Sequence, residues 1–153
     1  MLNVWIRVNI ELENSLLTCP SPSAAVWDQA VALYTGSVAS HTSGKNGFLL
    51  YSLAQVECGY FGTCTGGETA QVNQEIFANF VAGQQDMLQG DCNALEERIL
   101  RIRSLLIIPL VQGILRMAYA LDVQGTTGTS VQCTAGQSGG QGSCRWIGYL
   151  GQL

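Results

Sequence analysis

Apolar residues recur at helical spacing through most of the first 122 residues. In the segment after residue 20 they are Val26, Trp27, Ala30, Val31, Leu33 and Tyr34. Their steps of three and four place them on one face of a helix. Ser21 and Pro22 are typical of a helix start, and Gly36 is typical of the position just past a helix end. The pattern therefore predicts a first helix between these signals.

The same spacing predicts helices farther along the chain. A second helix is expected from about Phe48 to Cys58, and a third from an N-cap at Thr69 to about Gln89. Gly90 is the residue expected just past the end of that third helix.

The fourth helix is expected to begin with a capping box formed by Asn93 and Glu96. Pro109 lacks a backbone donor, so we expect a kink or a break there before helix resumes to about Leu121. The most apolar run, Leu105 to Leu115, is eleven residues long and contains Pro109, Gln112 and Gly113. It is too short and too interrupted to span a bilayer, and is better explained as a buried core helix.

The two ends of the chain differ from this pattern. Val4, Ile6, Val8 and Ile10 alternate with other residues, which predicts a strand over residues 1–13 or an extended arm over residues 1–20. Residues 123–153 are rich in Gly, Ser, Thr and Gln, which disfavours helix. The expected fold is therefore an all-α bundle of four to five helices over residues 21–122, with an N-terminal arm and a Gly-rich tail.

The cysteines indicate disulfides. They are Cys19, Cys58, Cys64, Cys92, Cys133 and Cys144. An even number without a Cys-x-x-Cys pair favours disulfides over zinc, and an oxidising compartment: secreted, periplasmic or lumenal. Six cysteines allow 15 pairings. The short spacings favour Cys58 with Cys64 and Cys133 with Cys144, which leaves Cys19 with Cys92. No signal peptide is recognisable at the N-terminus.

Charge is scarce in this sequence. Charged residues make up 12% of the chain and the net charge is −4. The first explanation of this low charge content is that neutral polar residues replace charged ones at the surface. The second is that a partner covers part of the surface. Arg98, Arg101 and Arg103 form the only cluster of basic residues, which excludes a nucleic-acid footprint. In the tail, Trp146 and Tyr149 are an aromatic pair suited to anchoring on a protein partner.

Little of the sequence suggests catalysis. Gly44-Lys45 lacks the upstream glycine of a phosphate-binding loop. Paired cysteines offer no thiol nucleophile. The single histidine, His41, cannot supply the Glu-x-x-His pairs of a di-iron bundle and is read as a loop residue. We therefore expect no enzymatic activity.

Several stretches between residues 25 and 122 resemble a known family. They include Val26-Trp27-Asp28-Gln29-Ala30, Cys58-Gly59-Tyr60-Phe61-Gly62-Thr63-Cys64, Val72-Asn73-Gln74-Glu75-Ile76-Phe77 and the run from Ile108 to Tyr119. In their order and spacing they resemble the algal iron-assimilating, high-CO2-inducible periplasmic proteins, the Fe-assimilating (FEA) family. The resemblance implies a secreted or cell-surface helical domain linked to iron uptake, with iron as its ligand.

Ferric iron favours carboxylate and phenolate oxygens. The candidate ligands are Asp28, Glu57 and Glu75, to which Tyr34, Tyr51 and Tyr60 could add phenolates. The alternative is that these carboxylates are solvated or capping groups on the surface. Glu75 and Asp86 are eleven residues apart and share a helix face. Glu97 and Arg101 have the spacing of an ordinary i,i+4 ion pair.

The sequence thus carries two hypotheses. The first is an extracellular or periplasmic iron-assimilation component that binds iron or presents it to a transporter. The second is a non-catalytic structural or interaction subunit of a larger lumenal or extracellular assembly that binds no metal. Both predict a protein partner and no nucleic acid. No transmembrane segment is expected, and association with a membrane surface stays open.

Overall fold

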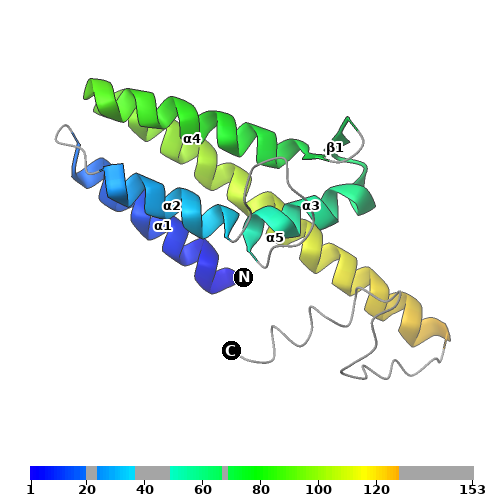
Figure 1. Cartoon of the computed structure of the whole chain (residues 1–153). Helices are drawn as coiled ribbons and strands as arrows, with labels where there is room; N and C mark the ends of the chain where they lie inside the picture. The colour runs from blue at the N-terminus through cyan, green and yellow to red at the C-terminus, as the bar shows by residue number, and fades with distance from the viewer. Residues whose placement is uncertain (20–23, 37–48, 67–68, 128–153) are drawn as a thin grey trace. The chain divides into compact units, whose positions relative to one another are not determined.

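The computed structural model describes residues 1–19, 24–36, 49–66 and 69–127, with side chains as far as residue 122 (Figure 1). In chain order its elements are α1 (Leu2–Leu17), α2 (Ala24–Thr35), α3 (Leu50–Phe61), β1 (Cys64–Thr65), β2 (Thr69–Ala70), α4 (Gln71–Gln89) and α5 (Cys92–Thr127). The two short strands pair antiparallel, Cys64 with Ala70 and Thr65 with Thr69. The all-α prediction is confirmed. By its contacts the chain divides into Met1–Gly113 and Ile114–Leu153.

The predicted N-terminal strand or arm is wrong, because residues 2–17 form helix α1. Two periods coexist in this segment. Besides the alternation of Val4, Ile6, Val8 and Ile10, the helical steps from Val8 to Leu12 and on to Ser15 define a second face, which consists of two apolar residues and a small polar one. Those three residues are buried in the structure. The helical period prevails because α1 packs along α2 and so removes that face from water.

The residues that cap the starts of α4 and α5 differ from those predicted. Thr69 does not cap α4, since it lies in β2, and Ala70 holds the N-cap position without a side-chain hydrogen bond. The capping box is also wrong: α5 begins at Cys92, and the Asp91 carboxylate accepts a hydrogen bond from the Ala94 amide at 3.0 Å. Gly90 ends α4 in the left-handed conformation, as predicted.

Pro109 does not break α5, which runs without interruption from Cys92 to Thr127. A proline inside a helix costs about 3 kcal/mol relative to alanine. Here the Pro109 ring is buried, and so are Leu105 and Leu106 in the turn before it. Burial of these side chains offsets the missing hydrogen bond, so the predicted break does not occur.

Aromatic side chains form the centre of the core. Trp27 and Tyr34 of α2 are buried beside Phe80 of α4, and Trp27 meets Phe80 edge to face with ring centres 5.6 Å apart. The Trp27 Nε1–H donates to the Phe80 carbonyl at 3.2 Å. Tyr34 packs edge to face against Tyr51 of α3 at 6.2 Å. These contacts join α2, α3 and α4, and Trp27 and Tyr34 belong to the apolar helix face that the sequence predicts.

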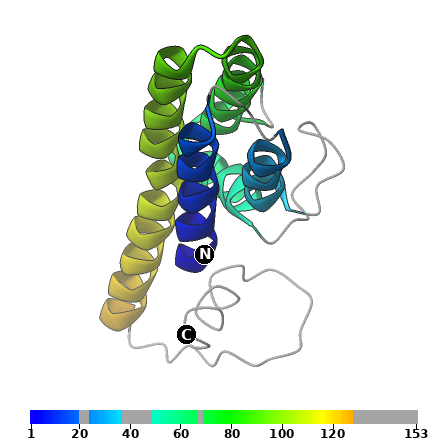
Figure 2. The same cartoon turned by 90° about the vertical axis from the view of Figure 1, so that its left-hand side faces the viewer.

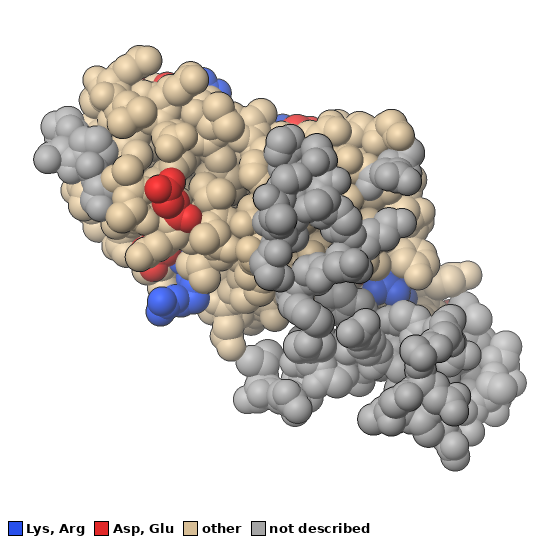
Figure 3. Space-filling view, in the orientation of Figure 1, with Lys and Arg blue, Asp and Glu red and all other residues tan. Residues whose placement is uncertain are grey.

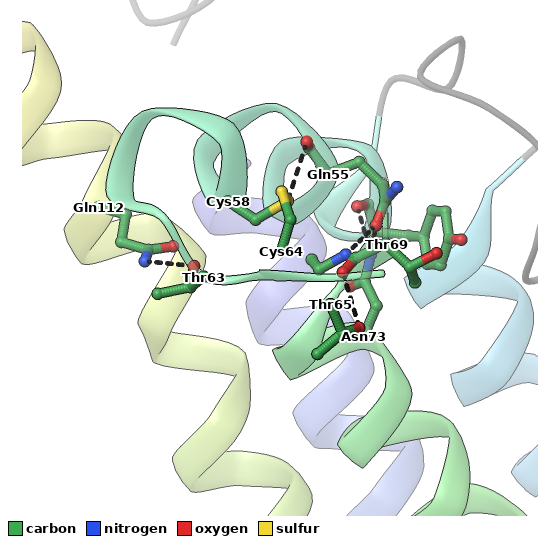
Figure 4. The surroundings of a disulfide bond; sticks show 10 residues. Gln55, Cys58, Thr63, Cys64, Thr65, Thr69, Asn73 and Gln112 are labelled. Carbon is green, nitrogen blue, oxygen red and sulfur yellow. Dashed lines mark hydrogen bonds between the residues drawn. A yellow bond between two sulfur atoms is a disulfide. The ribbon is translucent and has the colours of Figure 1, made fainter. Parts of the chain in front are cut away.

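A polar network crosses the same core. The buried Asn73 amide of α4 donates to the Tyr51 carbonyl at 3.1 Å and to Gln55 Oε1 at 2.9 Å. Its own oxygen accepts a hydrogen bond from the Tyr34 hydroxyl. Gln55 Oε1 also accepts from the Ala70 amide at 2.7 Å. A single asparagine therefore connects α2, α3 and α4, and through Gln55 also β2 (Figure 4).

Two predicted disulfides are confirmed. Cys58 and Cys64 close the turn between α3 and β1, beside the Gln55–Asn73 contact (Figure 4). Cys19 and Cys92, 73 residues apart, join the end of α1 to the start of α5. A disulfide that closes so long a loop stabilises the fold by about 4 kcal/mol, which is more than a short-range disulfide does, because it removes more conformational freedom from the unfolded chain. Cys133 and Cys144 lie outside the described residues.

We expect the Tyr34→Phe substitution to lower the free energy of unfolding by about 1–2 kcal/mol, because Asn73 Oδ1 loses its donor in a buried site. Burial, and then the neighbouring Tyr51, raises the pKa of Tyr34 well above its usual 10.0. The native protein therefore keeps this proton at a pH where the unfolded chain loses it. Stability should be constant up to about pH 10 and fall above it.

Guanidinium titrations between pH 8 and pH 11, followed by circular dichroism, measure both effects. The Tyr34→Phe variant should lose less stability above pH 10 than the wild type. Tyr119→Phe, at an exposed tyrosine, should behave like the wild type at every pH. Equal alkaline slopes for Tyr34→Phe and the wild type would contradict the role given to Tyr34.

Gly83 of α4 lets Trp27 approach the helix backbone. A Cβ atom at this position would lie 2.6 Å from two atoms of the Trp27 ring. We expect Gly83→Ala to destabilise the protein by about 1–3 kcal/mol through overpacking. Gly59→Ala in α3 is the matched control, because its Cβ would meet nothing within 4 Å. It should gain up to about 1 kcal/mol from helix propensity. Thermal unfolding of the two variants measures the difference, and equal melting temperatures would contradict it.

Candidate interaction surface

Helix α1 presents an apolar stripe on the side opposite its buried face. Leu2, Ile6, Ile10 and Leu17 follow at steps of four, four and seven, which keeps them on one side of the helix. Each is at least 41% exposed, and Leu17 reaches 74%. This stripe could have been read from the same spacing in the sequence. The strand prediction for residues 1–13 obscured it.

Helix α5 carries a second exposed apolar stripe. Its buried side consists of Leu95, Ile99, Ile102, Leu105 and Leu106. On the other side Leu100, Ile107 and Val111, at steps of seven and four, are 56%, 47% and 45% exposed. Reading the run from Leu105 to Leu115 as a buried core helix is therefore only half right. The run is apolar on all sides, and one core covers only one side of a helix.

The two stripes flank one ion pair. Helices α1 and α5 run side by side (Figure 2), and the Arg103 guanidinium of α5 binds the Glu13 carboxylate and the Asn9 carbonyl of α1. On α5, Leu100 and Ile107 lie about one turn before and after Arg103. On α1, Ile10 and Leu17 lie in the same relation to Glu13. We call the surface formed by Leu2, Ile6, Ile10, Leu17, Leu100, Ile107 and Val111 the outer face.

The basic cluster of α5 serves to hold neighbouring helices. Arg98 binds Asp86 at 3.2 Å and Arg101 binds Glu75 at 2.7 Å, both across to α4, whereas Arg103 binds Glu13 of α1. The predicted pair of Glu97 with Arg101 is therefore replaced by Glu75. The shared face of Glu75 and Asp86 is the face that meets α5. All three arginines are engaged by carboxylates.

Charge is also sparse on the surface. In the view of Figure 3, uncharged side chains cover most of the described surface, and the acidic and basic groups are few and scattered. A few exposed apolar residues are normal for a soluble protein. Two adjoining stripes on neighbouring helices form a contiguous patch instead, and such patches mark interaction sites.

Within the described part of the chain, α5 is the one helix long and apolar enough to cross a bilayer. The segment is Cys92–Asp122, and 22% of its most apolar 18-residue window is buried. The sequence suggested that this apolar segment is too short to span a bilayer. The helix that forms is longer than that segment, because it continues through Pro109. Length and composition are shared by core helices and membrane spans, so they do not decide between the two.

The structure places the three predicted metal ligands in different surroundings. Asp28 is exposed on α2, and Glu57 is fully buried in α3. Glu75 of α4 binds Arg101 and accepts a hydrogen bond from Gln71 at 3.3 Å. Among the residues described, no three His, Cys, Asp or Glu side chains gather as a metal site would require. Iron binding stays a prediction.

The candidate phenolates divide in the same way. Tyr34 and Tyr51 belong to the core, and burial raises the pKa of each phenol above its usual value, which disfavours the phenolate. Tyr60 is 64% exposed. His41, Trp146 and Tyr149 lie outside the described residues, so the predicted aromatic anchor of the tail stays a prediction.

Comparison with protein-family models, curated proteins and solved structures finds no match to this chain. The resemblance to the algal Fe-assimilating family therefore stays a hypothesis that rests on the sequence.

Proposed function

We propose that this protein is a non-catalytic interaction subunit that uses its outer face to bind another protein. The observation that carries the proposal is the pair of exposed apolar stripes on α1 and α5. Fully burying one Leu or Ile side chain yields about 1.5–3 kcal/mol, so a half-exposed one yields about 1 kcal/mol more when a partner covers it. The seven residues of the outer face together contribute on the order of 7 kcal/mol, from which the cost of association is subtracted.

The outer face is also held rigid. The Cys19–Cys92 disulfide joins its two helices at one end, and the Arg103–Glu13 pair joins them farther along. A surface fixed before binding loses little conformational entropy when it docks. Disulfides persist in oxidising compartments, which supports a secreted, periplasmic or lumenal site of action.

A photo-reactive amino acid at position 107, introduced in the cells that make the protein, tests this function. Irradiation should yield a discrete cross-linked product of defined mass, because Ile107 is exposed on the outer face. The matched control is position 88, where Leu88 of α4 is 68% exposed outside the outer face. No product from position 107, or equal products from both positions, would contradict the proposal.

Iron assimilation stays a second proposal, which the resemblance supports. The structural observation in its favour is Glu57, a predicted ligand whose side chain is 0% exposed. Glutamate is seldom fully buried in a protein unless it is paired, so the place of Glu57 in the core is unusual for its residue type.

Isothermal titration of the oxidised, chelator-stripped protein with ferric citrate and with ferrous iron tests the second proposal. It predicts saturable binding near one equivalent, weakened about tenfold or more by Glu57→Gln and left unchanged by Glu96→Gln on the exposed side of α5. Absence of saturable binding to folded protein would rule out direct iron binding. Because neither glutamate belongs to the outer face, this result is independent of the cross-linking.

A further inference from the structure

We propose that the partner of the outer face is a second copy of this chain, docked about a two-fold axis. The inference rests on the proposed interaction function and names its partner. The rival occupant of an apolar helical face is a lipid surface. Charge, area and symmetry each bear on the choice between them.

Charge disfavours lipid. The Arg103–Glu13 pair lies between the two apolar stripes, with side chains 32% and 49% exposed. A bilayer that covered the stripes would also cover this ion pair and remove both groups from water without offering new partners. A protein partner can instead provide opposite charges at the same place. An apolar surface with an ion pair near its middle is therefore better matched by protein.

Symmetry makes a second copy the fitting protein. In a two-fold interface the same patch lies on both subunits, so residue i meets residue j and j meets i. With the axis near the ion pair, Arg103 of one copy approaches Glu13 of the other, and Glu13 approaches Arg103. The four charges then alternate in sign and the four apolar stripes close around them. The outer face is thus complementary to itself.

The area is sufficient. Helix α1 has 16 residues, which corresponds to a length of about 24 Å. Two neighbouring helices whose axes lie about 8–10 Å apart present a face about 20 Å wide. The outer face therefore measures on the order of 500 Å², or about 1,000 Å² for both copies, the lower limit of specific interfaces. We expect exchange between monomer and dimer that depends on concentration.

Sedimentation equilibrium of the purified, oxidised full-length chain over a concentration series tests the proposal. The average mass should rise with concentration from 16.4 kDa toward twice that value. Ile107→Glu and Ile10→Glu should each weaken the association about tenfold or more, with unchanged circular dichroism. Val81→Glu is the matched control, since Val81 of α4 is 57% exposed away from the outer face, and it should associate like the wild type.

Charge reversal tests the two-fold geometry. Arg103→Glu and Glu13→Arg each bring like charges together in a homodimer, so each variant alone should associate more weakly than the wild type. A mixture of the two should form the heterodimer, in which every cross-subunit pair has opposite signs. Heterodimer formation supports the register. A mixture that associates no better than either variant alone would overturn it.

A flotation assay with vesicles of phosphatidylcholine and phosphatidylglycerol tests the rival. Wild-type protein that stays monomeric at all concentrations, yet floats with vesicles in a manner lost on Ile107→Glu, would overturn the second-copy proposal in favour of lipid. Monomeric protein that does not float would also overturn it. In that case a cross-link from position 107 to a different protein would still support the proposed interaction function. Absence of any cross-link would contradict both the interaction function and the second-copy proposal.

Discussion

The hydrogen bonds of Asn73 are the constraint on which the rest of the structure depends. A buried amide without partners costs about 1–3 kcal/mol, so the elements around it must arrive together. Here Tyr34 of α2 donates to Asn73, and the Tyr51 carbonyl and Gln55 side chain of α3 accept from it. An apolar core alone would tolerate several arrangements of these helices, whereas this network is satisfied in one. It fixes the positions of α2, α3 and α4 relative to one another.

Ion pairs and a disulfide connect α5 and α1 to these three helices. Arg98 and Arg101 join α5 to α4, and Arg103 then joins α5 to α1. Each exposed pair contributes at most about 1 kcal/mol, so stability is not their main effect. The buried face of α5, formed by Leu95, Ile99, Ile102, Leu105 and Leu106, sets the rotation of the helix about its axis, and the ion pairs agree with it. With Arg103 directed toward α1, Leu100 and Ile107 must face solvent beside the stripe of α1. The Cys19–Cys92 disulfide fixes the two helices in this register.

The sequence predicts what depends on local chemistry. The helical period of Trp27, Ala30 and Tyr34 shows one apolar face, and Gly90 marks a helix end, since both are properties of short segments. Short spacing paired Cys58 with Cys64 and left Cys19 for Cys92. The N-terminal prediction failed because Val4, Ile6, Val8 and Ile10 satisfy a strand period while Val8, Leu12 and Ser15 satisfy a helical one. Packing on α2 decides between them, and that contact is not local.

The α5 half of the candidate surface was beyond sequence reasoning for the same reason. In the sequence, an isoleucine of α5 that faces the core, such as Ile102, cannot be distinguished from one that faces water, such as Ile107. Which of the two occurs depends on how many apolar faces the rest of the chain can cover. Helices α1, α3 and α4 contact one side of α5. On the other side Leu100, Ile107 and Val111 remain exposed. The low share of charged residues, 12% of the chain, is therefore accompanied on α5 by apolar side chains at positions that face solvent.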